Sequence, residues 1–370
     1  MPTLPVVRLA PVSIAMPVVY SDRHRLHDPG GEVWVGVRIP GTELPARADR
    51  IRAALAETGA RVVDAEPQPD DAVLAVHERE LLDYLAGAWD DWRAAGLTAK
   101  PGQDRVVPYF FRHPGLHAPD SAVPAAPSAR AGWFAYDTMT LIGPGTWEAA
   151  RAAVDVAVTA ADLVAGGAPA AYACCRPPGH HATRSAFGGS CYLNNTAAAA
   201  VRLRETVDGP VAVLDVDAHH GNGTQALFYD RADVLVGSVH VDPGAGWFPH
   251  VLGFAREAGT GPGAGANRNV PLAPGAGDDR WLEAVAGLAS WARDSGAQGL
   301  VVALGVDAAG GDPESPLTVT AGGFREAGRL LGRLGLPTVV VQEGGYDLDA
   351  IGSLVGEALT GLEEGLLDEL

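Results

Sequence analysis

Cysteine and positive charge are both scarce in this chain of 370 residues. Cys174, Cys175 and Cys191 are its only cysteines, too few and too close together for a disulfide framework, and no C-x-x-C pair indicates a thiolate metal site. This usage predicts the reducing environment of the cytoplasm. Lysine and arginine number 27 against 45 aspartates and glutamates, which gives a formal net charge of -18. We therefore expect no nucleic-acid or membrane partner, whereas a cationic substrate is mildly favoured.

The N-terminal segment lacks a long apolar run. Residues 1–20 are interrupted by prolines and by Arg8, so they predict neither a signal peptide nor a membrane span. Hydrophobic residues nevertheless make up 47% of the chain, enough for a large core, and 47 glycines with 28 prolines indicate many turns and loops. The length lies within the range of large α/β domains, so we expect one domain.

Strand and helix patterns alternate along most of the chain. Apolar runs predict strands at Val18–Val19, Arg61–Asp64, Ala170–Cys175, from Val211, Val234–His240, Gly299–Leu304 and Pro337–Val341. Amphipathic patterns predict helices at Leu44–Thr58, His77–Ala95, Thr146–Val164 with Thr146 as its cap, Thr196–Glu205, Asp278–Asp294 and Ala321–Leu334. The alternation predicts an α/β fold, a single domain whose mostly parallel sheet is covered by helices on both faces. The proline-rich stretch of about 99–131 has little periodicity and is interpreted as a long inserted surface loop.

The stretch 211–225, V-A-V-L-D-V-D-A-H-H-G-N-G-T-Q, begins as an apolar strand and turns polar where the strand ends. Asp215 and Asp217 are two apart and share one face of an extended chain, and His219 continues that alternation. An Asp at a strand end is often a helix cap, and a single His is often a satisfied core group. Two acids and two imidazoles within six positions are costly to bury without a cation or matched hydrogen bonds, so we interpret the stretch as a metal site.

Ionisable or phenolic groups also follow three other predicted strands. The motif R-P-P-G-H-H carries His180 and His181, L-G-V-D carries Asp307, and Q-E-G-G-Y carries Tyr346. Ligands of parallel α/β sheets bind outside the carboxyl ends of the strands, so we expect these groups to gather near Asp217.

Together these groups suit a mononuclear zinc hydrolase. Asp217, His219 and Asp307 supply three protein ligands and leave positions for water and a substrate carbonyl. The paired imidazoles can remove the proton of the water and later protonate a leaving amine, when Asp215 and Asn222 fix their tautomers. The tyrosine after the two glycines can donate its hydroxyl to the developing oxyanion, although alone it is as readily a turn tyrosine. Fe²⁺ could occupy the same ligands, because affinity alone does not select the metal.

The ordered motifs R-P-P-G-H-H-A, G-G-S-C-Y-L-N-N, D-V-D-A-H-H-G-N-G-T-Q, L-G-V-D and E-G-G-Y resemble those of the histone deacetylase superfamily. The resemblance runs from Met16 to the C-terminus and is closest to the bacterial acetylpolyamine amidohydrolase and class II-like branch. G-P-G-T-W-E-A-A and F-P-H-V-L-G add to it. It implies an arginase/deacetylase-like fold for residues 16–370, with residues 1–15 as an N-terminal extension.

The resemblance also implies roles for particular residues. It implies a zinc site on Asp217, His219 and Asp307, and a catalytic pair of His180 and His181 supported by Asp215 and Asn222. It implies that Tyr346 is the transition-state tyrosine, and that structural potassium is bound by Asp215, Ser238 and Val239 with the backbones of Asp217 and His219. The implied substrate-binding wall consists of Gly189, Ser190, Phe248 and Gly345. A homodimer is implied as well, because in the related branch the long loop narrows the entrance by dimerisation.

Two positions depart from the family pattern. Ser190 stands where an aromatic tunnel residue is expected, and Arg130 in P-S-A-R-A-G-W-F stands near the position of an expected acid. If Arg130 faces the entrance, it repels a cationic tail, and we hypothesise that acetylpolyamines are then poor substrates. A clear preference for acetylpolyamines would instead mean that another acid binds the tail, with Asp120 or an acid near Asp22 as candidates.

These observations predict a zinc-dependent amidohydrolase that removes an acyl group, in the first place acetyl, from a small N-acylated amine such as an acetylpolyamine or a biosynthetic intermediate. A protein acetyl-lysine deacetylase is the alternative with the same chemistry. A catalytically silent binding protein is the third interpretation, and the complete set of ligands, imidazoles and tyrosine argues against it.

Overall fold

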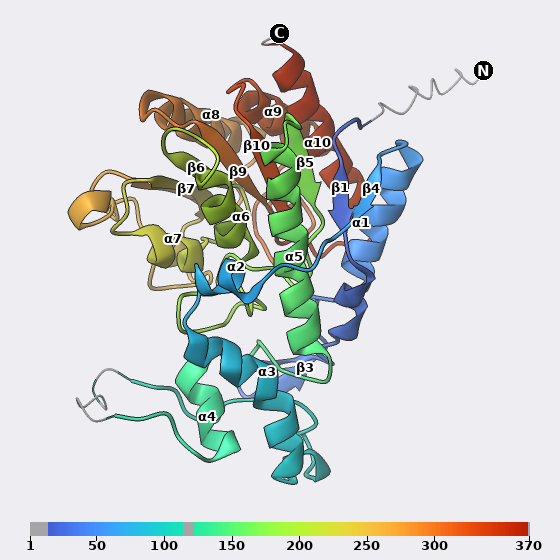
Figure 1. The fold of residues 1–370 in the computed structure, drawn as a ribbon, viewed down its shortest axis with the longest axis vertical. Helices are drawn as coiled ribbons and strands as arrows, with labels where there is room; N and C mark the ends of the chain where they lie inside the picture. Colours follow the sequence, from blue (N-terminus) through green and yellow to red (C-terminus); the bar gives the residue numbers. More distant parts are fainter. Residues whose placement is uncertain (1–13, 114, 116–120, 369–370) are drawn as a thin grey trace.

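An eight-stranded sheet forms the centre of the computed structural model, which describes residues 14–113, 115 and 121–368 (Figure 1). Its strand order is β4-β1-β5-β10-β9-β6-β7-β8, and every pairing in it is parallel. The strands are β1 (Val18–Tyr20), β4 (Val62–Asp64), β5 (Ala170–Ala173), β6 (Val211–Asp215), β7 (Val234–Val241), β8 (Asn267–Leu272), β9 (Gly299–Leu304) and β10 (Thr338–Gln342). A separate antiparallel hairpin pairs β2 (Glu32–Trp34) with β3 (Val37–Ile39).

Helices cover both faces of the sheet. The helices are α1 (Ala46–Glu57), α2 (Asp70–Leu74), α3 (Arg79–Ala94), α4 (Pro127–Phe134), α5 (Thr146–Ala165), α6 (Asn195–Arg204), α7 (Asn222–Phe228), α8 (Asp278–Asp294), α9 (Ala321–Gly332) and α10 (Ile351–Leu367). Helices α5 and α6 pack on one face, and α1, α8, α9 and α10 form the layer on the other (Figure 1). Helices α3 and α4 lie together beyond one end of the sheet.

The central strands are buried on both faces, which is why their sequences are continuous apolar runs. Along β6, Val213 belongs to the core under α5 and α6, whereas Leu214 belongs to the core under α8 to α10. Along β9, Val301 and Val302 divide between the two cores in the same way. This alternation of period two confirms the predicted α/β fold with a parallel sheet covered on both faces.

Most predicted elements are present, but the structure contains further elements that the sequence patterns did not predict. These are the hairpin β2–β3, the edge strand β8 and the helices α2, α7 and α10. The sequence of α10 contains several glycines, which lower helix propensity but allow close packing against α9. A Cβ added at Gly361 would lie 1.8 Å from the carbonyl oxygen of Arg325, so no larger residue fits there.

Two local predictions at element ends were wrong. Thr146 is the first residue of α5 and Gly145 is its cap, and the Thr146 hydroxyl accepts from Gly143 N instead. The stretch 99–131 is not wholly a loop, because α4 begins at Pro127.

Most of the proposed N-terminal extension lies outside the described residues. The packed chain includes Ile14, which is buried, and the backbone N–H groups of Ala15 and Met16 donate to the carboxylate of Glu363. Among the described residues, no helix combines the length and apolar character that crossing a membrane requires.

His77 fixes the segment that leads into α6 through a neutral imidazole. Its Nδ1 lies 2.8 Å from the Thr183 carbonyl oxygen, and its Nε2 accepts from Asn194 N at 2.8 Å. Nε2 cannot accept this bond once it is protonated. Burial accordingly lowers the pKa of His77 to about 4, although the bond to Thr183 opposes the shift.

This geometry predicts a pH-dependent stability difference between the wild type and His77→Gln. The folded-state pKa is depressed below the unfolded value, so the contribution of neutral His77 is complete above pH ~6.5 and is lost as pH falls toward ~4. We expect His77→Gln to be less stable than the wild type at pH 7, and the gap to shrink by on the order of 2 kcal/mol at pH 5. Denaturant unfolding of both proteins at both pH values measures the gap. An equal gap at pH 7 and pH 5 would show that His77 is not held neutral.

Candidate active site and metal centre

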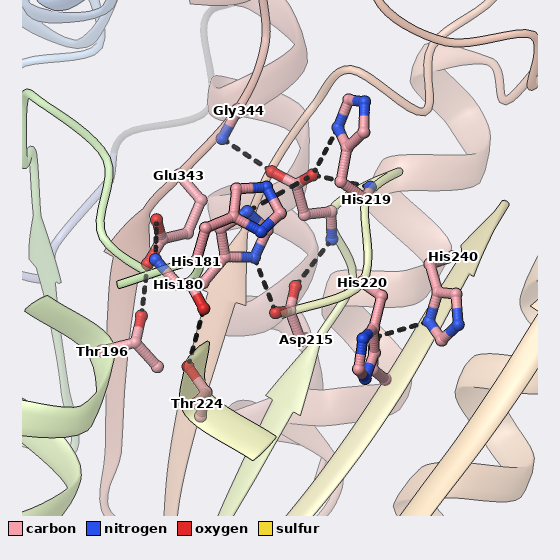
Figure 2. Close-up of polar contacts among 12 residues, drawn as sticks. His180, His181, Thr196, Asp215, His219, His220, Thr224, His240, Glu343 and Gly344 are labelled. Atoms are coloured by element: carbon pink, nitrogen blue, oxygen red, sulfur yellow. Dashed lines mark hydrogen bonds and ion pairs between the residues drawn. The ribbon is translucent and has the colours of Figure 1, made fainter. Parts of the chain in front are cut away.

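The candidate site lies at the carboxyl ends of four neighbouring strands, β5, β10, β9 and β6. The segment after β5 carries His180 and His181, the segment after β6 carries Asp217 and His219, and those after β9 and β10 carry Asp307 and Tyr346. Because the strands are parallel and adjacent, these segments meet at one edge of the sheet. Figure 2 shows the His180 imidazole hydrogen-bonded to Asp215, with the His181 ring next to it.

Asp217, His219 and Asp307 form a compact set of metal donors, with one ligand atom from each lying within 4.8 Å of the others. The Nδ1 atom of His219 is 3.0 Å from Asp307 Oδ2 and 3.3 Å from Asp217 Oδ1. Both carboxylates are fully buried, and His219 is partly exposed. One imidazole and two carboxylates suit a divalent cation such as Zn²⁺, with coordination positions left for other ligands.

The electrostatics of these donors also fit a cation. Burial and the charge of Asp217 raise the pKa of Asp307 to about 7. Burial opposes ionisation of Asp217 as well, but His180 and His219 hold its pKa below the usual value. Two buried carboxylates this close repel each other unless a positive charge lies between them. The residues present therefore fit the metal that their identities imply.

Each imidazole of the histidine pair has its own partner. His180 Nδ1 lies 2.8 Å from Asp215 Oδ2, and His181 Nδ1 lies 2.7 Å from Asn222 Oδ1. Burial lowers the pKa of His180, but the carboxylates of Asp215 and Asp217 raise it to about 10. Burial, and then the charge of His180, lower the pKa of His181 well below its usual value. The two rings, with centroids 4.0 Å apart, thus differ in their affinity for a proton.

Buried Glu343 organises the backbone behind this pair, a role that the sequence analysis did not assign. Its Oε2 accepts from the N–H groups of Gly179 and His180 at 2.6 and 3.1 Å, and its Oε1 accepts from the Thr196 hydroxyl at 2.6 Å (Figure 2). The carboxylate thereby ties the segment after β5 to α6 and β10. Its place directly before the two glycines of Q-E-G-G-Y was visible in the sequence, but nothing there indicated these partners.

Tyr346 lies in a loop that is held from two sides. The guanidinium of Arg47 lies 4.6 Å from the centre of the Tyr346 ring and donates to the carbonyl oxygens of Glu343 and Gly345. Asp312 accepts from Tyr346 N at 2.8 Å. Burial raises the pKa of the Tyr346 hydroxyl well above its usual value, so the phenol stays protonated and can donate a hydrogen bond.

A cavity of about 390 Å³ opens onto these groups. Of the predicted wall residues, Gly189, Ser190 and Phe248 line it, whereas Gly345 is not among the lining residues and has a left-handed φ of 120°. The full lining is Glu32, Trp34, Ile39, Thr42, Met139, His181, Gly189, Ser190, His219, Gly246, Trp247, Phe248, His250, Glu314 and Tyr346. Aromatic walls are therefore supplied by Trp34 and Trp247, although Ser190 stands where the family pattern has an aromatic residue.

Two side chains support the inner wall. Tyr136 donates to the carbonyl oxygen of His181 at 2.8 Å and stacks on Phe248 with centroids 6.2 Å apart. The partly buried carboxyl of Asp137 accepts from the backbone N–H of Gly189. Neither residue was predicted from the sequence, because both lie in the stretch between α4 and G-P-G-T-W-E-A-A, which carries none of the recognised motifs.

The structure does not meet the condition on which poor turnover of acetylpolyamines was expected. Arg130 donates to Asp91 Oδ2 at 2.8 Å and does not line the cavity. Within one chain, the Arg130 guanidinium therefore does not reach a substrate bound in the cavity and does not repel it. Of the candidate acids, Asp120 lies outside the described residues, and Asp22 pairs with Arg25 on the surface.

The predicted potassium ligands come from adjacent strands. Asp215 at the end of β6 pairs in register with Ser238 of β7, and Val239 follows it. The Ser238 hydroxyl lies 2.8 Å from His240 Nδ1.

Comparison with known proteins identifies the family. The family model for the histone deacetylase domain matches residues 42–362. The chain is 40% identical over 348 residues to the acetylpolyamine amidohydrolase of Mycoplana ramosa, covering 94% of this chain and 99% of that protein. It is also 40% identical over 351 residues to acetylpolyamine amidohydrolase 1 of Pseudomonas aeruginosa, covering 93% and 98%. A crystal structure of acetylpolyamine aminohydrolase from Burkholderia pseudomallei matches with a TM-score of 0.88 at 36% identity, covering 95% of this chain and 99% of the other. This chain therefore belongs to the histone deacetylase family.

Proposed function

We propose that the protein is a zinc-dependent amidohydrolase that removes acetyl from a small N-acetylated amine. The observation that carries the proposal is that His181, His219 and Tyr346 line one cavity, with Asp217 and Asp307 close to His219. The names of the relatives, which act on acetylpolyamines, support a small amine as the substrate.

The proposed chemistry begins at the metal donors. Asp217, His219 and Asp307 would hold Zn²⁺, and Fe²⁺ has access to the same donors. When bound, the cation supplies Lewis-acid chemistry, polarising the amide carbonyl and lowering the pKa of water. The backbone N–H groups of His219 and Gly344 fix the two oxygens of Asp217 at 2.8 and 2.7 Å, so this donor is oriented before any ligand arrives.

The histidine pair then moves protons. His181 reaches the cavity, so we assign it the proton of the attacking water and later its delivery to the leaving amine. Its Nδ1 faces the Asn222 amide oxygen, which favours the tautomer that leaves Nε2 able to accept a proton. His180 is absent from the lining and is hydrogen-bonded to Asp215, and we assign it the role of a positively charged neighbour of the His181 ring.

Tyr346 completes the proposed machinery as a hydrogen-bond donor. Its protonated hydroxyl is assigned to the oxygen of the scissile carbonyl, which gains negative charge in the transition state. The bonds from Arg47 and to Asp312 hold its loop before the substrate binds.

Three finer features belong to this proposal. Asp215, Ser238 and Val239, with the backbones of Asp217 and His219, are assigned to structural potassium, and the pairing of β6 with β7 supports this assignment. A homodimer through the loop of about 99–131 is supported by the exposed aromatic residues Tyr109 and Phe111. Cytoplasmic location is supported by three free, buried cysteines.

Acetate release from two substrates tests the proposed function. We expect turnover of a mono-acetylated diamine with a kcat/KM at least about tenfold above that of an acetyl-lysine peptide, since a small ligand can be enclosed by the cavity. A chelator should abolish both activities, and added Zn²⁺ should restore them. A preference for the peptide would favour the protein deacetylase alternative, and activity unaffected by the chelator would contradict a metal-dependent reaction.

A further inference from the structure

A tight turn of the cavity wall, residues 188–191, lies against the ring of His181. Gly188 and Cys191 exchange two backbone hydrogen bonds, of 3.1 and 3.0 Å, across this wall turn. Its two central residues, Gly189 and Ser190, line the cavity. A Cβ atom added at Gly189 would lie only 2.4 Å from Cδ2 of His181. The backbone of the turn therefore packs directly on the imidazole.

The wall turn has a backbone conformation that is unfavourable for one of its residues. Gly189 and Ser190 have φ values of 58° and 61°, and a tight hairpin turn of the primed type requires positive φ at both central positions. Glycine adopts this left-handed conformation freely, whereas a residue with a Cβ atom loses free energy in it. Ser190 therefore needs contacts outside the turn to keep this conformation.

Asp137 and Thr140, from the segment between α4 and α5, supply these contacts. Asp137 Oδ2 accepts from Gly189 N. Thr140 Oγ1 accepts from Ser190 N at 2.8 Å and donates to Asp137 Oδ2 at 3.1 Å. Both central N–H groups of the turn are thus bonded to one pair of side chains, which we call the clasp.

The clasp carboxylate depends on the donors around it. Among the residues that the structure describes, Asp137 forms no ion pair, and its hydrogen-bond donors are uncharged N–H and O–H groups. Burial raises the pKa of Asp137, while the N–H groups of Gly189 and Thr140 oppose the rise. A carboxylate in this position needs such donors to stay ionised, so the clasp and the wall turn stabilise each other.

The other contacts of His181 leave one edge of its ring to the wall turn. Tyr136 donates to the carbonyl oxygen of His181, which fixes its backbone, and Asn222 Oδ1 lies 2.7 Å from its Nδ1. The turn packs instead on Cδ2, which is bonded to Nε2. Nε2 is the atom to which the proposed chemistry assigns the proton of the attacking water.

We propose that Asp137 and Thr140 are positioning residues for proton transfer by His181. By holding the wall turn against the Cδ2 edge of the ring, the clasp keeps the neighbouring Nε2 directed into the cavity. Neither clasp residue lines the cavity, so both act through the turn rather than on the substrate. The inference rests on the proposed function, whose general base it supports.

Thr140→Val removes the clasp hydroxyl and keeps the shape of the side chain. We expect kcat for mono-N-acetyl-1,5-diaminopentane to fall about 5- to 20-fold, because a small misplacement of a catalytic group has an effect of this order. Zinc content and the circular dichroism spectrum should match those of the wild type. Thr140→Ser keeps the hydroxyl and should restore kcat to within about twofold of the wild type. Thr58→Val is the control, since its lost hydroxyl bonds to the Leu55 carbonyl oxygen outside the cavity lining.

Asp137→Asn tests the clasp from its other member. A carboxylate offers two acceptor oxygens, and the amide that replaces it offers one, so one group of N–H donors is left facing an NH₂ group. The Asp137 Oδ1 atom accepts from the N–H groups of Met139 and Thr140, and Oδ2 accepts from that of Gly189. We therefore expect a loss of kcat similar to that of Thr140→Val, with zinc still bound.

A double-mutant cycle distinguishes action through His181 from general damage to the wall. In a His181→Ala background, Thr140→Val should change kcat less than about twofold, because the ring that the clasp positions is absent. An equal loss in the presence and absence of the imidazole would overturn the inference while leaving the deacetylase intact. Wild-type kcat in both Thr140→Val and Asp137→Asn would overturn it as well. If the zinc-loaded wild type releases no acetate from the acetylated diamine, the proposed function itself is contradicted.

Discussion

Replacement of His219 with Ala is expected to remove the bound metal and to lower kcat by at least about 10³-fold. A catalytic metal supplies several kcal/mol of transition-state stabilisation, and ~4 kcal/mol corresponds to that factor. His219 contributes the imidazole of the donor set, and its loss leaves two carboxylates without the ring nitrogen that contacts both. The fold should persist, because the sheet is built from apolar strands that this ring does not support. Metal content and acetate release measure the effect, and far-UV circular dichroism checks the fold.

His113→Ala is the matched control for this variant. His113 is an exposed histidine of the long loop, outside the cavity lining. It should retain wild-type metal content and activity. Stoichiometric zinc in a folded His219→Ala protein would show that the assignment of the donors is wrong.

Replacement of Tyr346 with Phe is expected to lower kcat by on the order of 10²-fold or more, with KM changed less than about threefold. The substitution removes only the phenolic oxygen, and loss of one donor to a developing oxyanion has an effect of this size. The ring and its contact with Arg47 remain, so the cavity wall is preserved. Steady-state kinetics on an acetylated diamine give both constants.

Tyr229→Phe provides the comparison for Tyr346→Phe. Tyr229 follows the last residue of α7, is partly exposed and does not line the cavity, so loss of its hydroxyl should leave kcat unchanged. A Tyr346→Phe enzyme with wild-type kcat would exclude the tyrosine from the mechanism.

The sheet and its covering helices were predictable because each signal was local. The bounds of α8 and β9 agree with the prediction, since one has a sustained apolar stripe and the other a continuous apolar run. The hairpin β2–β3 gave no such signal. Its strands are largely exposed, so no apolar face is selected on either of them.

The motif residues were predictable as a group because each follows a predicted strand. Parallel strands bring their carboxyl ends to one edge, so spacing along the chain was sufficient to expect Asp307 near Asp217. The contacts within the cavity walls could not be predicted in this way. Thr42 links Glu32 to Glu314, residues 282 positions apart in the sequence, and no local pattern encodes that contact.

The position of Arg130 illustrates the same limit of sequence-based prediction. Its place beside W-F suggested a role at the entrance, but α4 directs its side chain to Asp91 of α3. The side-chain direction depends on how two helices pack, and the sequence near Arg130 contains no information about α3.

Titration of the metal-free enzyme with Zn²⁺ is the most direct test of the central claim that Asp217, His219 and Asp307 form one catalytic metal site. Acetate release from an acetylated diamine should rise linearly and reach a plateau at about one equivalent of zinc per chain, because Asp217, His219 and Asp307 supply the ligands for one ion. The His219→Ala protein should show no activity over the same range. Full activity of the metal-free enzyme, or an activation by zinc that is equal in the wild type and His219→Ala, would contradict the account.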